Sequence, residues 1–194
     1  MAIKRYFASK DNTITNAFKS NLSTRGTGSN MGQADILEVF SILGQASSSA
    51  GLSSELSRVL VEFDTTDIAA DRTAGTIPAS GSVSFYLKMY NAKHGQTLPK
   101  NYTMEVKAVT GSSGTREWEE GFGLDMEGYS DSTVGGTGSN WVNRMASTAW
   151  TAAGGDYANP DTDLSSSFAQ TFDDGTEDLE INVTTLVEQW VNSA

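Results

Sequence analysis

The alternation of apolar and polar residues along the chain predicts β-strands rather than helices. Apolar side chains take every second position of residues 83–90 and of residues 102–109, which is the two-residue period of a half-buried strand. The side chains expected to face the core are Val83, Phe85, Leu87, Met89, Met104, Val106 and Ala108. The same alternation occurs in residues 13–18, 35–42, 58–63 and 179–183. Six strands with one buried side each predict an all-β fold, an antiparallel β-sandwich.

One short helix is expected at the end of the chain, over residues 185–193. Thr185 and Glu188 have the spacing of a capping box, in which each side chain accepts from the other's backbone amide. The residues that follow place apolar side chains on one face of the helix, as an amphipathic helix requires. They are Leu186, Val187, Trp190 and Val191.

Long polar loops separate the predicted strands. The longest connection, residues 110–157, holds enough apolar mass to fold over one sheet as an insertion, including Trp118, Trp141 and Trp150. No fixed repeat and no boundary divides the sequence, so we expect a single domain over residues 1–194.

Composition excludes several classes of function. The 194 residues contain 13 basic and 24 acidic residues, so the net charge is −11, which argues against nucleic-acid binding. The absence of Cys excludes thiol nucleophiles and thiolate metal sites. No apolar run approaches the roughly 20 residues that span a bilayer, and no signal peptide follows Met1. We therefore expect no membrane partner and synthesis in the cytoplasm.

Charge is distributed unevenly along the chain. Residues 1–25 hold five basic residues and one acidic residue, whereas the chain after Arg144 holds nine acidic residues and no basic one. These loops are either simply solvated or arranged so that a basic end docks on an acidic partner or neighbour. The docking hypothesis centres on a basic N-terminal segment, residues 1–12. Its candidate residues are Lys4, Arg5, Lys10, Lys19 and Arg25.

Enzymatic chemistry has weak candidates. His94, the only histidine, lies in a polar stretch and is expected to be an exposed loop residue rather than a general base. A glycosidase needs two carboxyl groups near an aromatic platform, and a cluster of acids surrounds Trp118 and Phe122. The cluster consists of Glu117, Glu119, Glu120, Asp125 and Glu127. An acidic run in a glycine-rich loop is usually solvated, so we expect no enzyme and no cofactor.

A structural calcium ion is the one metal that the sequence leaves open, because it takes oxygen ligands alone. Two late turns carry several carboxylates each, although neither has the spacing of an EF-hand loop. The candidate ligands are Asp156, Asp161, Asp163, Asp173, Asp174 and Asp178. Plain acidic turns are the alternative explanation.

Several short phrases, taken in order, resemble the DNRLRE family of jelly-roll modules, which are related to carbohydrate-binding modules. They are Asn12-Thr13-Ile14, Asn30-Met31-Gly32, residues 56–64, Trp118-Glu119-Glu120-Gly121, Asn140-Trp141, Trp150 with residues 154–157, and residues 179–184 with Val187 and Trp190. These phrases and the N-terminal sequence MAIKRY also resemble structural proteins of marine tailed bacteriophages. Such modules usually continue into a closing strand, whereas this sequence ends at Ala194. The strand is then absent, or lies in a longer chain, or comes from a neighbour.

The resemblance implies a jelly-roll subunit of a phage particle, without enzymatic activity, that decorates the capsid or belongs to the tail or fibres. Its partners would be copies of itself or other virion proteins, bound through the basic N-terminus and the sheet edges. The alternative is a carbohydrate-binding module that holds a surface glycan by stacking on Trp118, Trp141 and Trp150. Tryptophans spread through a long insertion also form small cores of their own, and a shared fold does not carry sugar binding with it.

Overall fold

The computed structural model describes residues 3–43, 54–95, 98–110, 117–124, 138–158 and 167–192. Within these ranges strands outnumber helices and every paired strand is antiparallel, so the chain is β-rich. Its contacts group into two compact units, each built from two stretches of chain. Unit 1 comprises Met1–Phe63 and Thr110–Asp156, and unit 2 comprises Asp64–Val109 and Tyr157–Ala194. This grouping differs from the single compact domain expected from the sequence.

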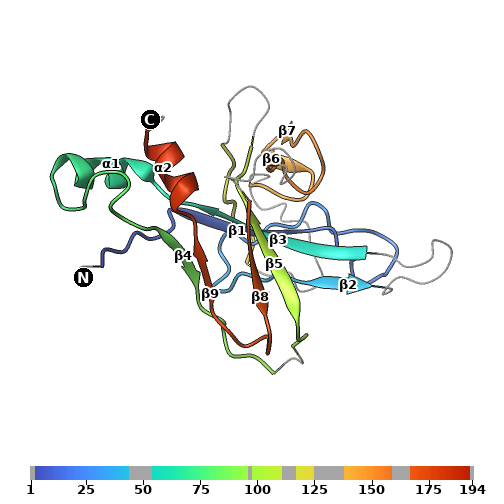
Figure 1. Ribbon diagram of the computed structural model, residues 1–194. Coiled ribbons are helices and arrows are strands. Elements are labelled where there is room, and N and C mark those ends of the chain that lie inside the picture. Colours follow the sequence, from blue (N-terminus) through green and yellow to red (C-terminus); the bar gives the residue numbers. More distant parts are fainter. Residues whose placement is uncertain are drawn as a thin grey trace. The chain divides into compact units, whose positions relative to one another are not determined.

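Unit 1 contains a three-stranded sheet in the order β1-β3-β2 (Figure 1). Its strands are β1 (Lys10–Thr15), β2 (Ser41–Leu43) and β3 (Ser54–Glu62). A short hairpin, β6 (Asn143–Met145) and β7 (Thr148–Ala149), comes from the second stretch of the unit. The stretch expected to form an insertion over a sheet thus belongs to the same compact unit as β1.

Unit 2 contains two two-stranded sheets and both helices (Figure 1). Strand β4 (Tyr86–Met89) pairs with β9 (Leu179–Asn182), and β5 (Tyr102–Lys107) pairs with β8 (Ser167–Phe172). The two sheets share one apolar core around Phe172, Leu179, Ile181 and Val183. Tyr102 and Phe172 stack across their strand pair, with ring centroids 4.9 Å apart.

The expected core faces of β4 and β5 are confirmed, whereas Val83, also expected in the core, lies before the start of β4. Phe85, Leu87, Met89, Met104 and Val106 pack on the shared core. Ala108 packs in a neighbouring cluster with Ala158 and Leu186. The period-2 pattern succeeds here because each strand has one side against apolar neighbours and the other against water.

The expected C-terminal helix is also present, as α2 (Thr184–Asn192). The helix starts one residue before Thr185, where the Thr184 amide donates to Asn182 Oδ1 at 3.0 Å. The Glu188 carboxylate accepts from Arg72 on helix α1 (Thr65–Thr73). An ion pair thus connects the two helices of unit 2.

Two other predictions of local structure are wrong. The strand expected over residues 35–42 is limited to Ser41–Leu43, and Ile36 and Val39 lie 53% and 52% exposed. Side chains of neighbouring strands bind the backbone before β2: Thr13 Oγ1 accepts from the Glu38 amide and Ser57 Oγ accepts from the Phe40 amide. Helix α1 was not expected, although Asp64 caps its start by accepting from Thr66 and Gly75 follows its end with a φ of 73°.

Candidate functional site

The five basic docking candidates divide into two groups. Lys10 and Arg25 are used inside unit 1: Lys10 pairs with Glu62 at 2.9 Å, and Arg25 donates to the Asn16 carbonyl at 2.7 Å while lying 4.3 Å from the Phe18 ring. Lys19 is half-buried in a turn, where its amide donates to the Thr24 carbonyl. Lys4 and Arg5 are exposed. Only these last two fit a docking role directly.

The boundary of the docking segment at residue 12 is therefore corrected. Strand β1 begins at Lys10, and the Ser9 amide already donates to the Glu62 carbonyl at 2.8 Å. Asn12 is fully buried. The stretch that is outside the sheet comprises residues 3–8, which we call the N-terminal segment.

The N-terminal segment is unusual in exposing large apolar side chains together with positive charge. Ile3 and Phe7 are each 83% exposed, the highest exposure among the described large apolar residues. Lys4 and Arg5 lie between them in sequence, and the Lys4 ammonium lies 5.5 Å from the Tyr6 ring centroid. Exposed apolar residues grouped in this way mark an interaction surface more often than isolated ones do.

The tryptophans of the glycan hypothesis do not form a stacking platform. Trp118, Trp141 and Trp150 are only 3%, 7% and 6% exposed. Trp150 Nε1 donates to the Asn140 carbonyl at 2.9 Å, and the Arg58 guanidinium covers Trp141 at 4.9 Å. Since a sugar needs an open ring face, these side chains act as the apolar part of unit 1.

Two buried carboxamides connect the phrases on which the family resemblance rests. Asn30 makes four hydrogen bonds: its Nδ2 donates to the Glu120 and Ser139 carbonyls, and its Oδ1 accepts from the Gly32 and Gly123 amides. Their lengths lie between 2.7 and 3.0 Å. The amide thus uses its full hydrogen-bonding capacity on four chain positions.

Asn12 extends this polar network. Its Nδ2 donates to the carbonyl and the hydroxyl of Ser139, both at 2.8 Å, and its Oδ1 accepts from the Met31 amide at 2.8 Å. A Cβ added to Gly123 would overlap the Asn30 carbonyl, so only glycine permits this close approach. Asn12, Asn30, Ser139 and the glycines around them hold unit 1 together, and all four hydrogen-bonding positions of the Asn30 side chain are occupied.

Two carboxylates of the enzyme hypothesis, those of Glu119 and Glu120, are also bound to backbone amides, while Glu117 is exposed and its carbonyl accepts from Arg144. Glu119 Oε2 accepts from the Gly138 and Ala146 amides at 3.1 and 3.0 Å, and Glu120 Oε1 accepts from the Asp11 amide at 2.9 Å. Burial, together with the charge of Glu120, raises the pKa of Asp11 above its ordinary value. Both glutamates position chain segments of unit 1, while Asp125 and Glu127 lie outside the described residues.

The calcium candidates are not brought together by the described part of the fold. Asp156 lies in unit 1, where its two carboxylate oxygens accept from the Thr151 and Ala152 amides. Asp174 pairs with Lys100 at 3.5 Å, and Asp178 accepts from the Asn91 amide. Asp173 bonds through its amide to Glu177. No three acidic or histidine side chains converge among the described residues, and Asp161 and Asp163 lie outside them.

Glu177 illustrates what these acidic turns do. Its Oε1 accepts from the Asp173 and Asp174 amides at 2.8 and 2.9 Å, and backbone hydrogen bonds of the turn, that of Asp174 first, lower the pKa of Glu177. The carboxylate therefore stabilises the connection between β8 and β9 through hydrogen bonds to backbone amides.

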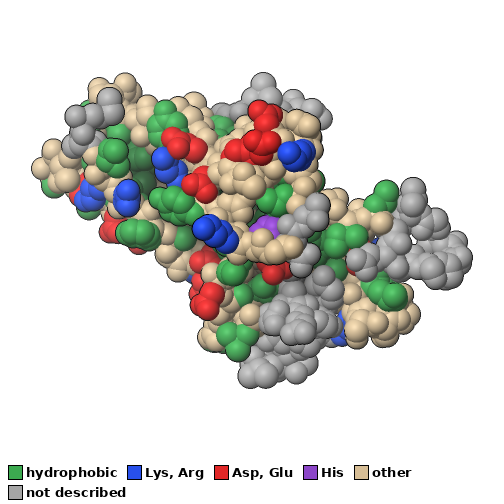
Figure 2. All heavy atoms as spheres, turned by 90° about the horizontal axis from the view of Figure 1, so that it is seen from below, with side chains coloured by type: hydrophobic (Ala, Val, Ile, Leu, Met, Phe, Trp, Pro, Cys, Tyr) green, Lys and Arg blue, Asp and Glu red, His purple; other side chains and the backbone are tan. Residues whose placement is uncertain are grey.

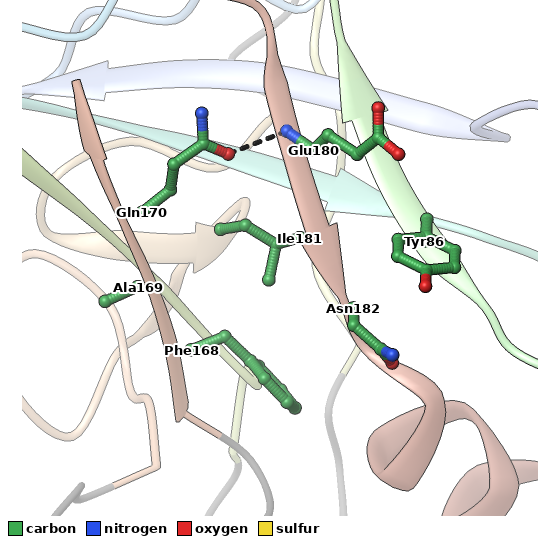
Figure 3. A pocket seen from close by; sticks show the side chains of 7 residues that line it. All are labelled: Tyr86, Phe168, Ala169, Gln170, Glu180, Ile181 and Asn182. Carbon is green, nitrogen blue, oxygen red and sulfur yellow. Dashed lines mark hydrogen bonds between the residues drawn. The ribbon is translucent and has the colours of Figure 1, made fainter. Parts of the chain in front are cut away.

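A shallow groove of about 560 Å³ opens between β8 and β9 in unit 2 (Figure 3). Phe168 and Ile181 form its apolar part, and Tyr86, Glu180 and Asn182 lie on the β4–β9 side. The Gln170 side chain reaches from β8 to the Glu180 amide of β9 at 2.8 Å (Figure 3). Sequence analysis missed this groove because the alternation in residues 167–172 is interrupted by the polar Gln170.

The surface around these features carries charge of both signs. On the face shown in Figure 2, acidic side chains gather in several groups with basic side chains between them. Unit 2 contains 12 acidic and 5 basic residues, a net charge of −7, and unit 1 contains 12 acidic and 8 basic residues, a net charge of −4.

His94 is exposed, as expected. Neither helix among the described residues has the length and apolar character needed to cross a bilayer.

Comparison of the chain with family models, with curated proteins and with solved structures finds no match.

Proposed function

We propose that this chain is a non-enzymatic structural subunit that associates with copies of itself through its N-terminal segment. The observation that carries the proposal is the exposure of Ile3 and Phe7 on either side of Lys4 and Arg5. Leaving two large apolar side chains in water has a cost that a partner surface would remove. The net charge of −11 supplies acidic surface for the two cations.

The candidate catalytic and binding groups already have hydrogen-bonding partners, and this supports the non-enzymatic part of the proposal. The carboxylates of Glu119 and Glu120 and the carboxamides of Asn12 and Asn30 are bonded to groups of their own unit. Groups that already have good hydrogen-bonding partners are poor candidates for binding or proton transfer.

The biological setting and the finer topology belong to the same proposal. The resemblance to tailed-phage structural proteins favours a virion protein, on the capsid surface or in the tail or fibres, and a jelly-roll arrangement of the strands. The antiparallel pairing in both units is compatible with that arrangement.

The proposal is tested by the molar mass in solution, measured by light scattering over a range of protein concentrations. We expect the full chain to self-associate, and a chain lacking residues 1–8 to be monomeric with an unchanged circular dichroism spectrum. Substituting both Ile3→Ser and Phe7→Ser in the full chain should have the same effect. Ile36→Ser with Val39→Ser is the matched control, because these two side chains are also exposed but lie outside the segment. A full chain that stays monomeric at every concentration would refute the proposal.

A further inference from the structure

Among the described residues, no strand pairs with the facing edges of β8 and β9 in unit 2. In an antiparallel pair, the backbone groups of alternate residues point toward the partner strand and those between them point away. The Asn101 amide donates to the Asp173 carbonyl, so Phe168 and Gln170 turn their backbone groups away from β5. The Val183 amide donates to the Phe85 carbonyl, so Glu180 and Asn182 turn theirs away from β4.

The Gln170 side chain shows what kind of partner this edge accepts. Its Nε2 donates to the Asp178 carbonyl at 2.9 Å, and its Oε1 accepts from the Glu180 amide at 2.8 Å. One residue of a parallel strand would donate to the carbonyl of one residue and accept from the amide two positions later, as the Gln170 side chain does. This side-chain amide thus takes the place of one strand residue, and the groups of Asn182 and Phe168 beyond it face the groove.

The N-terminal segment has the properties that this groove requires. Residues 3–8 are exposed or half-buried, lie outside the sheet of unit 1 and contain no proline or glycine. As a strand, the segment would place Ile3, Arg5 and Phe7 on one face and Lys4 and Tyr6 on the other, so each face carries one cation. The groove offers apolar contact at Phe168 and Ile181 and negative charge at Glu180, within a unit of net charge −7.

We propose that the N-terminal segment of one copy binds as an added strand in the β8–β9 groove of a second copy. This inference rests on the proposed self-association and names its acceptor surface. Main-chain hydrogen bonds to the open edges would supply affinity, and Ile3, Phe7 and the two cations would supply selectivity. Because donor and acceptor are different surfaces, the contact is either reciprocal in a dimer or head-to-tail in a larger assembly.

The inference is tested by mixing two chains that are each defective in one surface. The first lacks residues 1–8 and keeps the groove. The second keeps the segment but carries Glu180→Lys, a reversal at a side chain that is 54% exposed and pairs only at the surface with Lys88. Each chain alone should be monomeric, and the mixture should form a one-to-one complex. The full-length chain carrying Glu38→Lys is the matched control and should associate like the wild type, because Glu38 is an exposed acid of unit 1.

Two results would overturn the inference while leaving self-association intact. One is continued self-association of the Glu180→Lys chain at the wild-type concentration. The other is the absence of a complex in the mixture when the wild-type chain does associate. Either result would place the acceptor elsewhere on the chain.

A peptide titration tests the groove even if the full chain is monomeric. The probe is a fluorescently labelled peptide of residues 3–8, titrated with the chain that lacks residues 1–8. We expect saturable binding that Glu180→Lys weakens at least about fivefold and that a peptide with serine at positions 3 and 7 does not show. Failure of the wild-type peptide to bind would refute the groove as its acceptor. Binding by a chain that does not self-associate would refute the proposed function and leave the groove as a peptide site.

Discussion

The two units of this chain are stabilised by different kinds of interaction. All eight buried polar residues of the described structure lie in unit 1, among them Asn12, Asn30 and Ser139. Both units bury apolar side chains, but among the described residues unit 2 combines a shared apolar core around Phe172 and Ile181 with no buried polar residue. Burial of apolar surface is non-directional, whereas a buried carboxamide stabilises only the arrangement that satisfies it. Buried polar residues thus add directional constraints in unit 1, whereas unit 2 depends on an apolar pattern spread over its strands.

The largest effect is expected from Asn30→Ala in unit 1. It removes four hydrogen bonds and leaves the Glu120 carbonyl and the Gly32 and Gly123 amides without this partner, at about 1–3 kcal/mol for each buried group that stays unsatisfied. The Ser139 carbonyl keeps its hydrogen bond from Asn12, so we expect unit 1 to lose at least about 3 kcal/mol of stability. Denaturant unfolding followed by tryptophan fluorescence measures it, because three of the four tryptophans lie in unit 1.

Asn21→Ala is the matched control for that substitution. Asn21 Oδ1 also accepts from two backbone amides, those of Ser23 and Thr24, but the residue is exposed. Water replaces its bonds, so the loss should be below about 1 kcal/mol. Equal effects of the two substitutions would contradict the role assigned to the polar network.

Ile181→Ala should have the next largest effect, and in unit 2. Ile181 is 6% exposed in the shared core, and truncating a buried isoleucine costs about 2–5 kcal/mol. Circular dichroism reports the loss across the whole chain, and fluorescence at low denaturant should show unit 1 largely intact. Ile36→Ala, at a 53% exposed position, should change little. Unfolding of both units together in every variant would show that the two kinds of core are not independent.

Glu188→Gln tests the half-buried ion pair between Arg72 and Glu188 in unit 2 and its pH dependence. The Arg72 hydrogen bond lowers the pKa of Glu188, and the two side chains are only 13% and 14% exposed. Since the folded-state pKa lies below the ordinary value of 4.5, the pair contributes stability above that pH and loses it as pH falls through the folded-state value. We expect a loss of about 2 kcal/mol at pH 7.

The difference between Glu188→Gln and wild type should narrow in thermal melts below pH 4. Glu180→Gln is the control, because its pair with Lys88 is more than half exposed and contributes little. A difference that stays constant down to pH 3 would mean that the charge of Glu188 is not what stabilises the contact.

The smallest effect, of opposite sign, is expected from Asp11→Asn. Burial and the neighbouring Glu120 raise the pKa of Asp11, so folding favours its protonated form and ionisation near neutral pH is unfavourable. The Asp11 amide keeps its bond to Glu120 in the variant. A slightly higher melting temperature at pH 7, with no gain at pH 3, is the expected result, and destabilisation at pH 7 would contradict it.

The difference between the two units also explains which elements the sequence could predict. Strands β4, β5 and β9 and the stripe of α2 follow the apolar period, and their core faces were predicted correctly. In unit 1 the pattern misled: Ile36 and Val39 lie in the strand predicted over residues 35–42 but are exposed, and Thr13 and Ser57 bind the backbone there. Helix α1 had readable signals in Asp64 and Gly75 that a weak apolar stripe obscured.

The candidate sites also differ in how much of each the sequence could predict. The basic N-terminus was visible from charge, but its boundary was not, because nothing in the sequence shows that Asn12 is buried. The phrases of the family resemblance contain Asn12, Asn30 and Glu120 of the polar network, which the sequence alone did not connect. The β8–β9 groove depends on Gln170, a polar residue at a core-facing position between Phe168 and Phe172. A rule that looks only for alternation discards such a strand.

In the proposed assembly, the N-terminal segment and the β8–β9 groove form the interface between copies, while the polar network of unit 1 serves only folding. Hydrogen exchange of the full chain, followed by mass spectrometry at dilute and at associating concentrations, tests it most directly. We predict slower exchange on association in peptides covering residues 3–8 and the edges of β8 and β9, with unchanged exchange around Asn12, Asn30 and Ser139. Association that leaves residues 3–8 exchanging at the unprotected rate would contradict the account.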